Sequence, residues 1–160
     1  MHTYIHKVQY YETDKMGITH HSNYIRWMEE ARVDFLDRIG YGYAKLERGG
    51  ILSPVIGVEC RYQHPTTFDD AVEIAVGVEE FKGVRLVIGY TMTDLATGRP
   101  VLTGRTMHCF TDAAGKPVIL KKRFPEFDAV LRSQVSCGEN TAPWRSDREP
   151  AANAATEGTI

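Results

Sequence analysis

One segment of this chain carries the apolar spacing of a long helix, and most of the rest alternates in the manner of strands. The apolar residues that recur at intervals of three and four are Tyr24, Trp27, Met28, Ala31 and Phe35. Side chains at these intervals share one face of a helix. Ser22 or Asn23 can cap the first turn and Gly40 can end the last, so the pattern predicts one helix of roughly 16 residues.

Alternation of apolar and polar residues predicts strands on both sides of this helix. The alternating segments are residues 3–10, 55–62, 71–79, 86–92 and 102–110. Short breaks with turn chemistry, such as 82–83 and 96–100, favour an antiparallel meander over parallel βαβ units. Residues 124–131 can form a short closing helix. Because a lone amphipathic helix must bury its apolar face, we expect it to pack across the sheet in an α+β fold.

The length of 160 residues suits one domain, and the last part of the chain differs in composition. Large apolar side chains after residue 136 are limited to Trp144 and Ile160. We therefore expect a folded domain over residues 1–136 and a disordered tail over 137–160. No apolar run approaches the roughly 18 residues of a membrane span, and no secretory leader is recognisable. A net charge of −2 disfavours a nucleic-acid partner.

Three scattered cysteines offer no Cys-x-x-Cys pair, so the sequence predicts neither a disulfide framework nor a metal site. Free thiols without an export signal favour a cytoplasmic protein.

The segment 11–24 joins the first strand to the helix and gathers groups that can carry chemistry. It holds Asp14, Gly17 and the pair His20 and His21. A helix N-terminus presents unpaired N–H groups that can hold an oxyanion, and a carboxylate can fold back beside it. A carboxylate and such N–H groups could carry out thioester hydrolysis, because a thiolate leaves with little help from a general acid. The spacing alone leaves open that Asp14 only forms a turn.

These residues belong to a longer motif. It runs Tyr11-x-Thr13-Asp14-x-x-Gly17-x-x-x-His21-x-x-Tyr24, then Trp27-Met28-Glu29-Glu30-Ala31-Arg32, Pro54 to Tyr62 and Pro65 to Asp70. Over residues 4–125 the chain resembles the 4-hydroxybenzoyl-CoA thioesterase-like branch of the hotdog-fold acyl-CoA thioesterases. The resemblance implies a hotdog fold, in which an antiparallel sheet of five or six strands wraps one long central helix. It also implies an enzyme that hydrolyses an acyl-CoA to a carboxylic acid and free CoA, without a cofactor.

The resemblance also implies roles for single residues. Asp14 corresponds to the family's catalytic carboxylate, which acts as nucleophile or general base. His21 corresponds to a second group with a catalytic or substrate-orienting role. The backbone N–H groups of His21 and Ser22 are expected to form the oxyanion hole. The expected pocket residues are Gly17, Tyr24, Trp27 and Met28. Family members form homodimers or homotetramers with active sites between subunits, so some contacts to the acyl-CoA should come from the partner subunit.

Several alternatives stay open from the sequence. The run Lys121, Lys122 and Arg123 can bind CoA phosphates or simply be solvated. Glu29, Glu30 and Arg32 favour a solvated or ion-paired helix face over a buried polar contact between subunits. An acyl-thioester hydratase or dehydratase and a non-catalytic acyl-thioester binding protein are the alternative functions. The sequence does not specify the acyl group, the carrier (CoA or acyl carrier protein) or the choice between dimer and tetramer.

Overall fold

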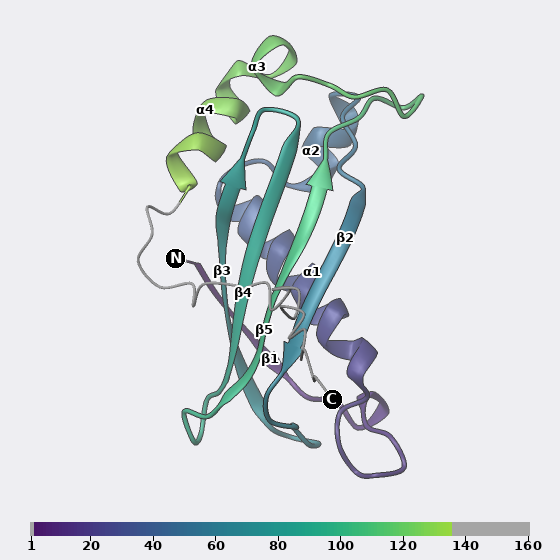
Figure 1. Cartoon of the computed structure of the whole chain (residues 1–160), viewed down its shortest axis with the longest axis vertical. Coiled ribbons are helices and arrows are strands. Elements are labelled where there is room, and N and C mark those ends of the chain that lie inside the picture. The colour runs from purple at the N-terminus through teal and green to yellow at the C-terminus, as the bar shows by residue number, and fades with distance from the viewer. Residues whose placement is uncertain (1, 136–160) are drawn as a thin grey trace, which may run out of the picture.

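The computed structural model describes residues 2–135, so the tail expected over 137–160 lies outside the described residues. Five antiparallel strands form one sheet, and α1 (His21–Arg38) crosses one of its faces (Figure 1). The strands are β1 (His2–Lys7), β2 (Val55–Tyr62), β3 (Ala71–Phe81), β4 (Arg85–Asp94) and β5 (Pro100–Cys109). The shorter helical elements are η1 (Tyr10–Glu12), α2 (Tyr43–Arg48), α3 (Leu120–Arg123) and α4 (Pro125–Gln134). The predicted α+β fold with one long helix is confirmed.

The strands follow the order β1-β3-β4-β5-β2. The hairpins β3–β4 and β4–β5 are the expected meander. The prediction that β2 belongs to the same meander is wrong, because β2 pairs with β5 at the far edge, with Val58 opposite Thr106. The connection from β2 to β3 passes beside the loop that precedes α1, where the C=O of Thr66 accepts the N–H of Thr19 at 2.8 Å. This connection therefore becomes part of the surroundings of the candidate site.

The apolar face of α1 forms the centre of the core. Trp27, Met28 and Ala31 are each 0% exposed. The same buried cluster includes Val72, Ile74, Val76, Ile88, Tyr90, Met92 and Leu102 from the strands. Gly104 on β5 permits the close approach of helix and sheet, because a Cβ there would lie 2.5 Å from Cε of Met28. A Cβ there would also lie 2.8 Å from the backbone C=O of Glu59 on β2, so a larger residue would force the end of Met28 to move and would crowd the neighbouring strand.

The ends of α1 and of the first strand differ from the prediction in detail. His20 is the N-cap, and its Nδ1 accepts the N–H of Ser22 at 3.4 Å, so the prediction of Ser22 or Asn23 as N-cap is wrong. The helix ends just before Gly40, which has the left-handed φ of +82° expected of a helix terminator. The first strand stops at Lys7, because the chain then turns into η1.

A buried polar cluster lies where α1 crosses β4 and β5. Arg32 is 5% exposed, and its Nη1 donates to Nε2 of His108 at 3.1 Å. Thr106 Oγ1 lies 2.7 Å from the same Nε2 and 3.0 Å from the hydroxyl of Tyr90. The sequence favoured a solvated or ion-paired face for Arg32. Its guanidinium does pair with Glu29, with 3.8 Å between Nη2 and Oε2, but the side chain is buried and not solvated, because the helix directs it toward β5. Glu29, one turn earlier, is exposed as expected.

This cluster should make the protein sensitive to acid. Burial and the neighbouring guanidinium of Arg32 lower the pKa of His108 from 6.5 to about 4. Between these values the unfolded chain binds a proton at His108 that the folded chain does not. The free energy of unfolding is therefore unaffected by the protonation of His108 above pH 6.5. It falls by about 3 kcal/mol as the pH is lowered from 6.5 toward 4.

Urea unfolding at a series of pH values from about 7.5 to about 4 measures this loss. His108→Leu should remove roughly 3 kcal/mol of the pH dependence. Equal pH dependence of the wild type and His108→Leu would contradict the assignment.

Candidate active site

The loop between η1 and α1 is a tight hairpin that carries Asp14. The N–H of Asp14 donates to the C=O of Ile18, and the N–H of Gly17 donates to the C=O of Asp14, both at 2.9 Å. Gly17 has a φ of +76°, a conformation that favours glycine. Oδ1 of Asp14 accepts the N–H of Met16 at 2.7 Å, which is the turn-forming role left open by the sequence. Within residues 2–135, Oδ2 has no hydrogen-bond partner and remains available for chemistry.

The start of α1 lies directly after this hairpin and presents a backbone donor. The N–H of His20 donates to the C=O of Glu12 at 2.8 Å, and that of Asn23 to the C=O of His20 at 2.9 Å. The N–H of Ser22 faces the His20 imidazole at 3.4 Å. No acceptor for the N–H of His21 occurs in the described part of the chain. Of the two amides expected in the oxyanion hole, that of His21 is thus available without rearrangement.

A cavity of about 300 Å³ opens at this helix start. Its lining residues are Ile18, Thr19, His21, Tyr24, Tyr62, Gln63, His64 and Pro65. The hydroxyl of Tyr62 donates to the C=O of His21 at 3.1 Å, and its ring lies edge-on to that of Tyr24, with 5.6 Å between centroids. The hydroxyl of Tyr24 in turn accepts the N–H of Thr66 at 3.2 Å. Two aromatic rings and a backbone donor thus meet at one small cavity.

The structure brings together only part of the predicted substrate pocket. His21 and Tyr24 line the cavity, and Gly17 lies in the hairpin whose returning arm lines it. Trp27 and Met28 are instead placed in the core between α1 and the sheet, without exposed surface. Their spacing from Tyr24 puts them on the same helix face. After the first turn of α1, however, this face packs against the sheet and no longer borders the cavity.

The predicted cationic run lies far from this cavity within one protomer. Lys121, Lys122 and Arg123 form α3, at the opposite end of the sheet from the start of α1 (Figure 1). Arg123 lies beside the chain that leads into β2, because a Cβ on Gly50 would be 3.4 Å from its Nη2. Within one protomer these cations and the cavity beside His21 therefore lie at opposite ends of the sheet.

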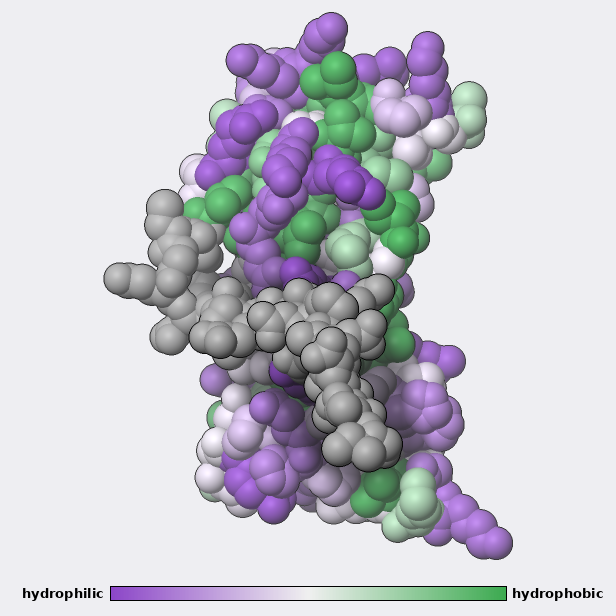
Figure 2. Space-filling model, in the orientation of Figure 1, coloured by the Kyte–Doolittle hydropathy of each residue, from purple (hydrophilic) through white to green (hydrophobic). Residues whose placement is uncertain are grey.

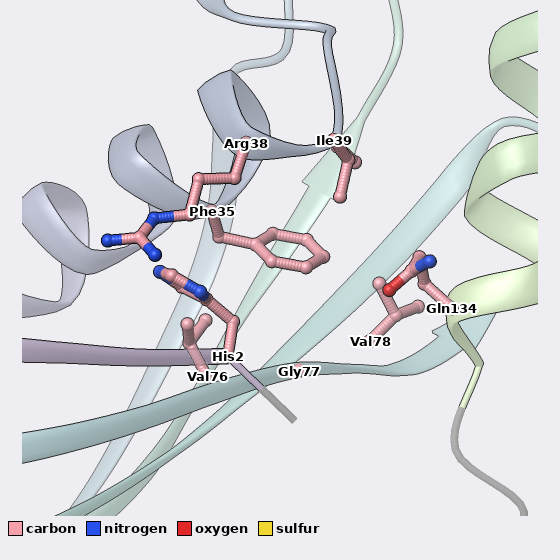
Figure 3. A pocket seen from close by; sticks show the side chains of 8 residues that line it. All are labelled: His2, Phe35, Arg38, Ile39, Val76, Gly77, Val78 and Gln134. Carbon is pink, nitrogen blue, oxygen red and sulfur yellow. The ribbon is translucent and has the colours of Figure 1, made fainter.

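A second cavity, of about 250 Å³, lies at the other end of α1 (Figure 3). The ring of Phe35 projects into it from the helix, opposite Val78 on β3. His2 and Arg38 lie at its rim, and both are paired with the carboxylate of Asp34. None of the motif residues with an expected role lines this cavity, so the cavity beside His21 is the candidate active site.

Other chemistries find less support in the described residues. No group of three His, Cys, Asp or Glu side chains within residues 2–135 could hold a metal ion. Cys60 and Cys109 are free, and burial raises the pKa of the Cys60 thiol, which disfavours the nucleophilic thiolate. No helix in the same range is long and apolar enough to cross a membrane.

Two residues at the site were not predicted from the sequence. Tyr62 was assigned only to a strand face, and Glu12 occupied an unassigned position of the motif. Glu12 is 4% exposed and lies beneath the hairpin. Gln9 and Glu12 are separated by the three-residue interval of a capping box, and the structure forms this box. The interval is the sequence signal that could have identified Glu12.

Comparison with known proteins agrees with this geometry. The model of the thioesterase-like superfamily matches residues 8–135. YneP of Bacillus subtilis (strain 168), a provisionally assigned acyl-CoA thioesterase, is 31% identical over 121 residues, which cover 76% of this chain and 88% of that protein. The structure of a DHNA-CoA thioesterase from Staphylococcus aureus matches with a TM-score of 0.78 and 30% identity, over 82% of this chain and 88% of that one. TT1821 from Thermus thermophilus matches with a TM-score of 0.74 and 31% identity, over 82% and 98%.

A long helix crossing an antiparallel sheet, with a cavity at its N-terminus, is the arrangement expected of the hotdog fold. The chain belongs to the thioesterase-like superfamily. The predictions of a hotdog fold and of a thioesterase are thereby confirmed.

Proposed function

We propose that this chain hydrolyses acyl-CoA thioesters to carboxylic acids and free CoA in the cavity beside His21. The observation that carries the proposal is the unpaired N–H of His21 at the start of α1, next to the hairpin that holds Asp14. A backbone donor at the positive end of a helix stabilises a developing oxyanion. Asp14 is not among the residues that line the cavity, but its hairpin leads directly into this helix start, and its carboxylate is the group we propose as nucleophile or general base.

The reaction then divides into two steps. The thioester carbonyl oxygen accepts the N–H of His21, and either Oδ2 of Asp14 or a water that it activates attacks the carbonyl carbon. Collapse of the tetrahedral intermediate expels the CoA thiolate, which needs little protonation because thiols have a pKa of about 8.5. If Asp14 attacks, water hydrolyses the resulting anhydride. The imidazole of His21 lines the same cavity and orients the water.

We propose further that the working enzyme is at least a homodimer joined through β2. Within the described residues β2 has one neighbour, β5, so its other edge offers unpaired backbone groups. The large apolar side chains that β2 exposes are Val55, Ile56, Val58 and Tyr62. Apolar surface, green in Figure 2, follows the upper and middle part of the molecular edge where Figure 1 draws β2. An exposed apolar edge strand favours pairing with its own copy.

Antiparallel pairing of two β2 strands would bring the α3 cations of one protomer toward the cavity of its partner. A two-fold axis near Val58 sets the start of the partner's β2 beside the Tyr62 end of this one. Tyr62 contacts His21, and the start of β2 follows the segment that Arg123 approaches. Lys121, Lys122 and Arg123 of α3 would therefore bind the CoA phosphates at the partner's site. We propose that the reaction needs no cofactor, because CoA is part of the substrate and the protein provides the other groups.

We also propose a cytoplasmic location, which the free thiols Cys60 and Cys109 fit.

An α,β-unsaturated acyl-CoA separates this proposal from a hydratase of the same fold. We expect free thiol to appear with the double bond retained in the released acid. Thiol-specific detection and product mass follow both outcomes in one sample. Addition of water across the double bond without thiol release would identify the hydratase, and binding without any product would identify a non-catalytic carrier.

A further inference from the structure

The hairpin that carries Asp14 rests on a buried carboxylate two residues earlier. Oε2 of Glu12 accepts the N–H of Gln9 at 2.7 Å and lies 2.9 Å from Nε2 of His6, and Oε1 accepts the indole N–H of Trp27 at 2.7 Å. Burial raises the pKa of Glu12, but these hydrogen bonds outweigh burial and leave the pKa below its ordinary value. The side chain is therefore an ionised carboxylate with every oxygen committed.

The backbone of the same residue holds the start of α1. The C=O of Glu12 accepts the N–H of His20 at 2.8 Å and the side-chain amide of Asn23 at 2.8 Å. His20 immediately precedes the donor of the proposed oxyanion hole, and Asp14 follows two residues after Glu12. Glu12 is thus joined by short connections to both halves of the proposed machinery.

The support beneath Glu12 is itself rigid. Nδ1 of His6 lies 2.9 Å from Oε2 of Glu30, to which the hydroxyl of Tyr4 donates at 3.0 Å. The imidazole of His6 also stacks on Trp27, with 4.4 Å between centroids and 28° between planes. An imidazole held between two carboxylates and against an indole cannot rotate without breaking several contacts. The position of Glu12 is therefore fixed from β1 and from α1 together.

We propose that Glu12 is a positioning residue for hydrolysis, which sets the distance between the Asp14 carboxylate and the N–H of His21. This inference rests on the proposed function and goes beyond it. Glutamine at this position keeps the shape but replaces one acceptor oxygen by an NH₂ group. In one orientation the NH₂ faces the indole of Trp27; in the other it faces the N–H of Gln9 and His6. Two donors that face each other repel, so either the hairpin that carries Asp14 or the start of α1 must move. A displacement of about 1 Å costs roughly 100-fold in rate.

The test is Glu12→Gln, alone and combined with Asp14→Asn, on the full chain. We expect the single variant to lower kcat about 30- to 100-fold with KM changed less than about threefold. In the Asp14→Asn background the same change should lower the remaining single-turnover rate less than about threefold, because the Asp14 carboxylate, one of the two groups whose separation Glu12 sets, is already absent. Asp128→Asn is the matched control, since Asp128 is equally buried and hydrogen-bonded to Arg132 in α4. It should lower the melting temperature and leave kcat unchanged.

Two results would overturn the inference. One is a wild-type kcat in folded Glu12→Gln, and the other is an equal rate loss in both backgrounds, as a purely structural role requires. If Glu12→Gln does not fold, Asn23→Ala removes only the bond to the Glu12 carbonyl; it should lower kcat about tenfold at unchanged KM, and an unchanged kcat would contradict the proposal. Failure of the proposed function is seen separately, as retained turnover in Asp14→Asn alone.

Discussion

Asp14→Asn should lower kcat for acyl-CoA hydrolysis about 1,000-fold in a protein that remains folded, because a positioned carboxylate contributes roughly 100- to 10,000-fold. The amide that replaces it is neither a nucleophile nor a base of useful strength. Its oxygen can still accept the N–H of Met16, as Oδ1 does now at 2.7 Å, so the hairpin keeps its turn. Steady-state thiol release measures the loss, and circular dichroism with thermal unfolding confirms the fold.

The chain contains a closely matched control for this variant. Asp112 forms the same kind of turn, with Oδ1 accepting the N–H of Ala114 at 2.9 Å, and Gly115 there has a φ of +78° where Gly17 has +76°. Asp112→Asn should keep wild-type turnover, because that turn is not followed by the start of a long helix. Equal activity of the two variants would leave Asp14 with its turn-forming role only.

Val58→Asp should convert the proposed dimer into a monomer and lower turnover about 100-fold or more. Val58 lies near the middle of β2, where antiparallel pairing about a two-fold axis brings it close to its own copy. Two carboxylates meeting there would repel each other and oppose burial of the edge. In this proposal the separated subunit loses the cations of the partner's α3 and the other contacts to the acyl-CoA expected from the partner. Sedimentation velocity reports the mass and thiol release reports the activity.

Leu95→Asp controls for a new charge on an exposed apolar residue. Leu95 is 51% exposed and follows β4, away from β2. This variant should keep the oligomeric state and the activity of the wild type. A Val58→Asp protein that stays dimeric, or a monomer with full activity, would exclude the β2 edge as the functional interface.

The fold was predictable from the sequence wherever the signal was local. Intervals of three and four identified α1, and alternation identified the strands, because one buried face leaves a periodic trace. The place of β2 beside β5 was not predictable, since strand pairing depends on distant partners such as Val58 and Thr106. α2, of six residues, is too short for a helical period to emerge.

The candidate site was likewise predictable where its signals are local in sequence and not where they depend on distant partners. The motif located Asp14, Gly17 and His21 because a turn, a glycine and a helix start lie close together in sequence. The burial of Arg32 was missed, because a charged residue in sequence gives no sign of a distant partner such as His108. Glu12 was missed although its interval from Gln9 was a local signal, because that interval does not reveal the partner Trp27. A buried indole N–H needs an acceptor, so the presence of Trp27 in the predicted core was a clue that a nearby polar group is buried with it.

The measurement that tests the central claim most directly is product formation by the wild-type protein on a panel of short-chain, long-chain and aromatic acyl-CoA thioesters. Free thiol and carboxylic acid are quantified in the same reaction. The proposed function predicts that at least one class yields equal amounts of acid and CoA at a rate far above the uncatalysed background. Absence of thiol release across the whole panel, from a folded protein that binds these thioesters, would contradict it.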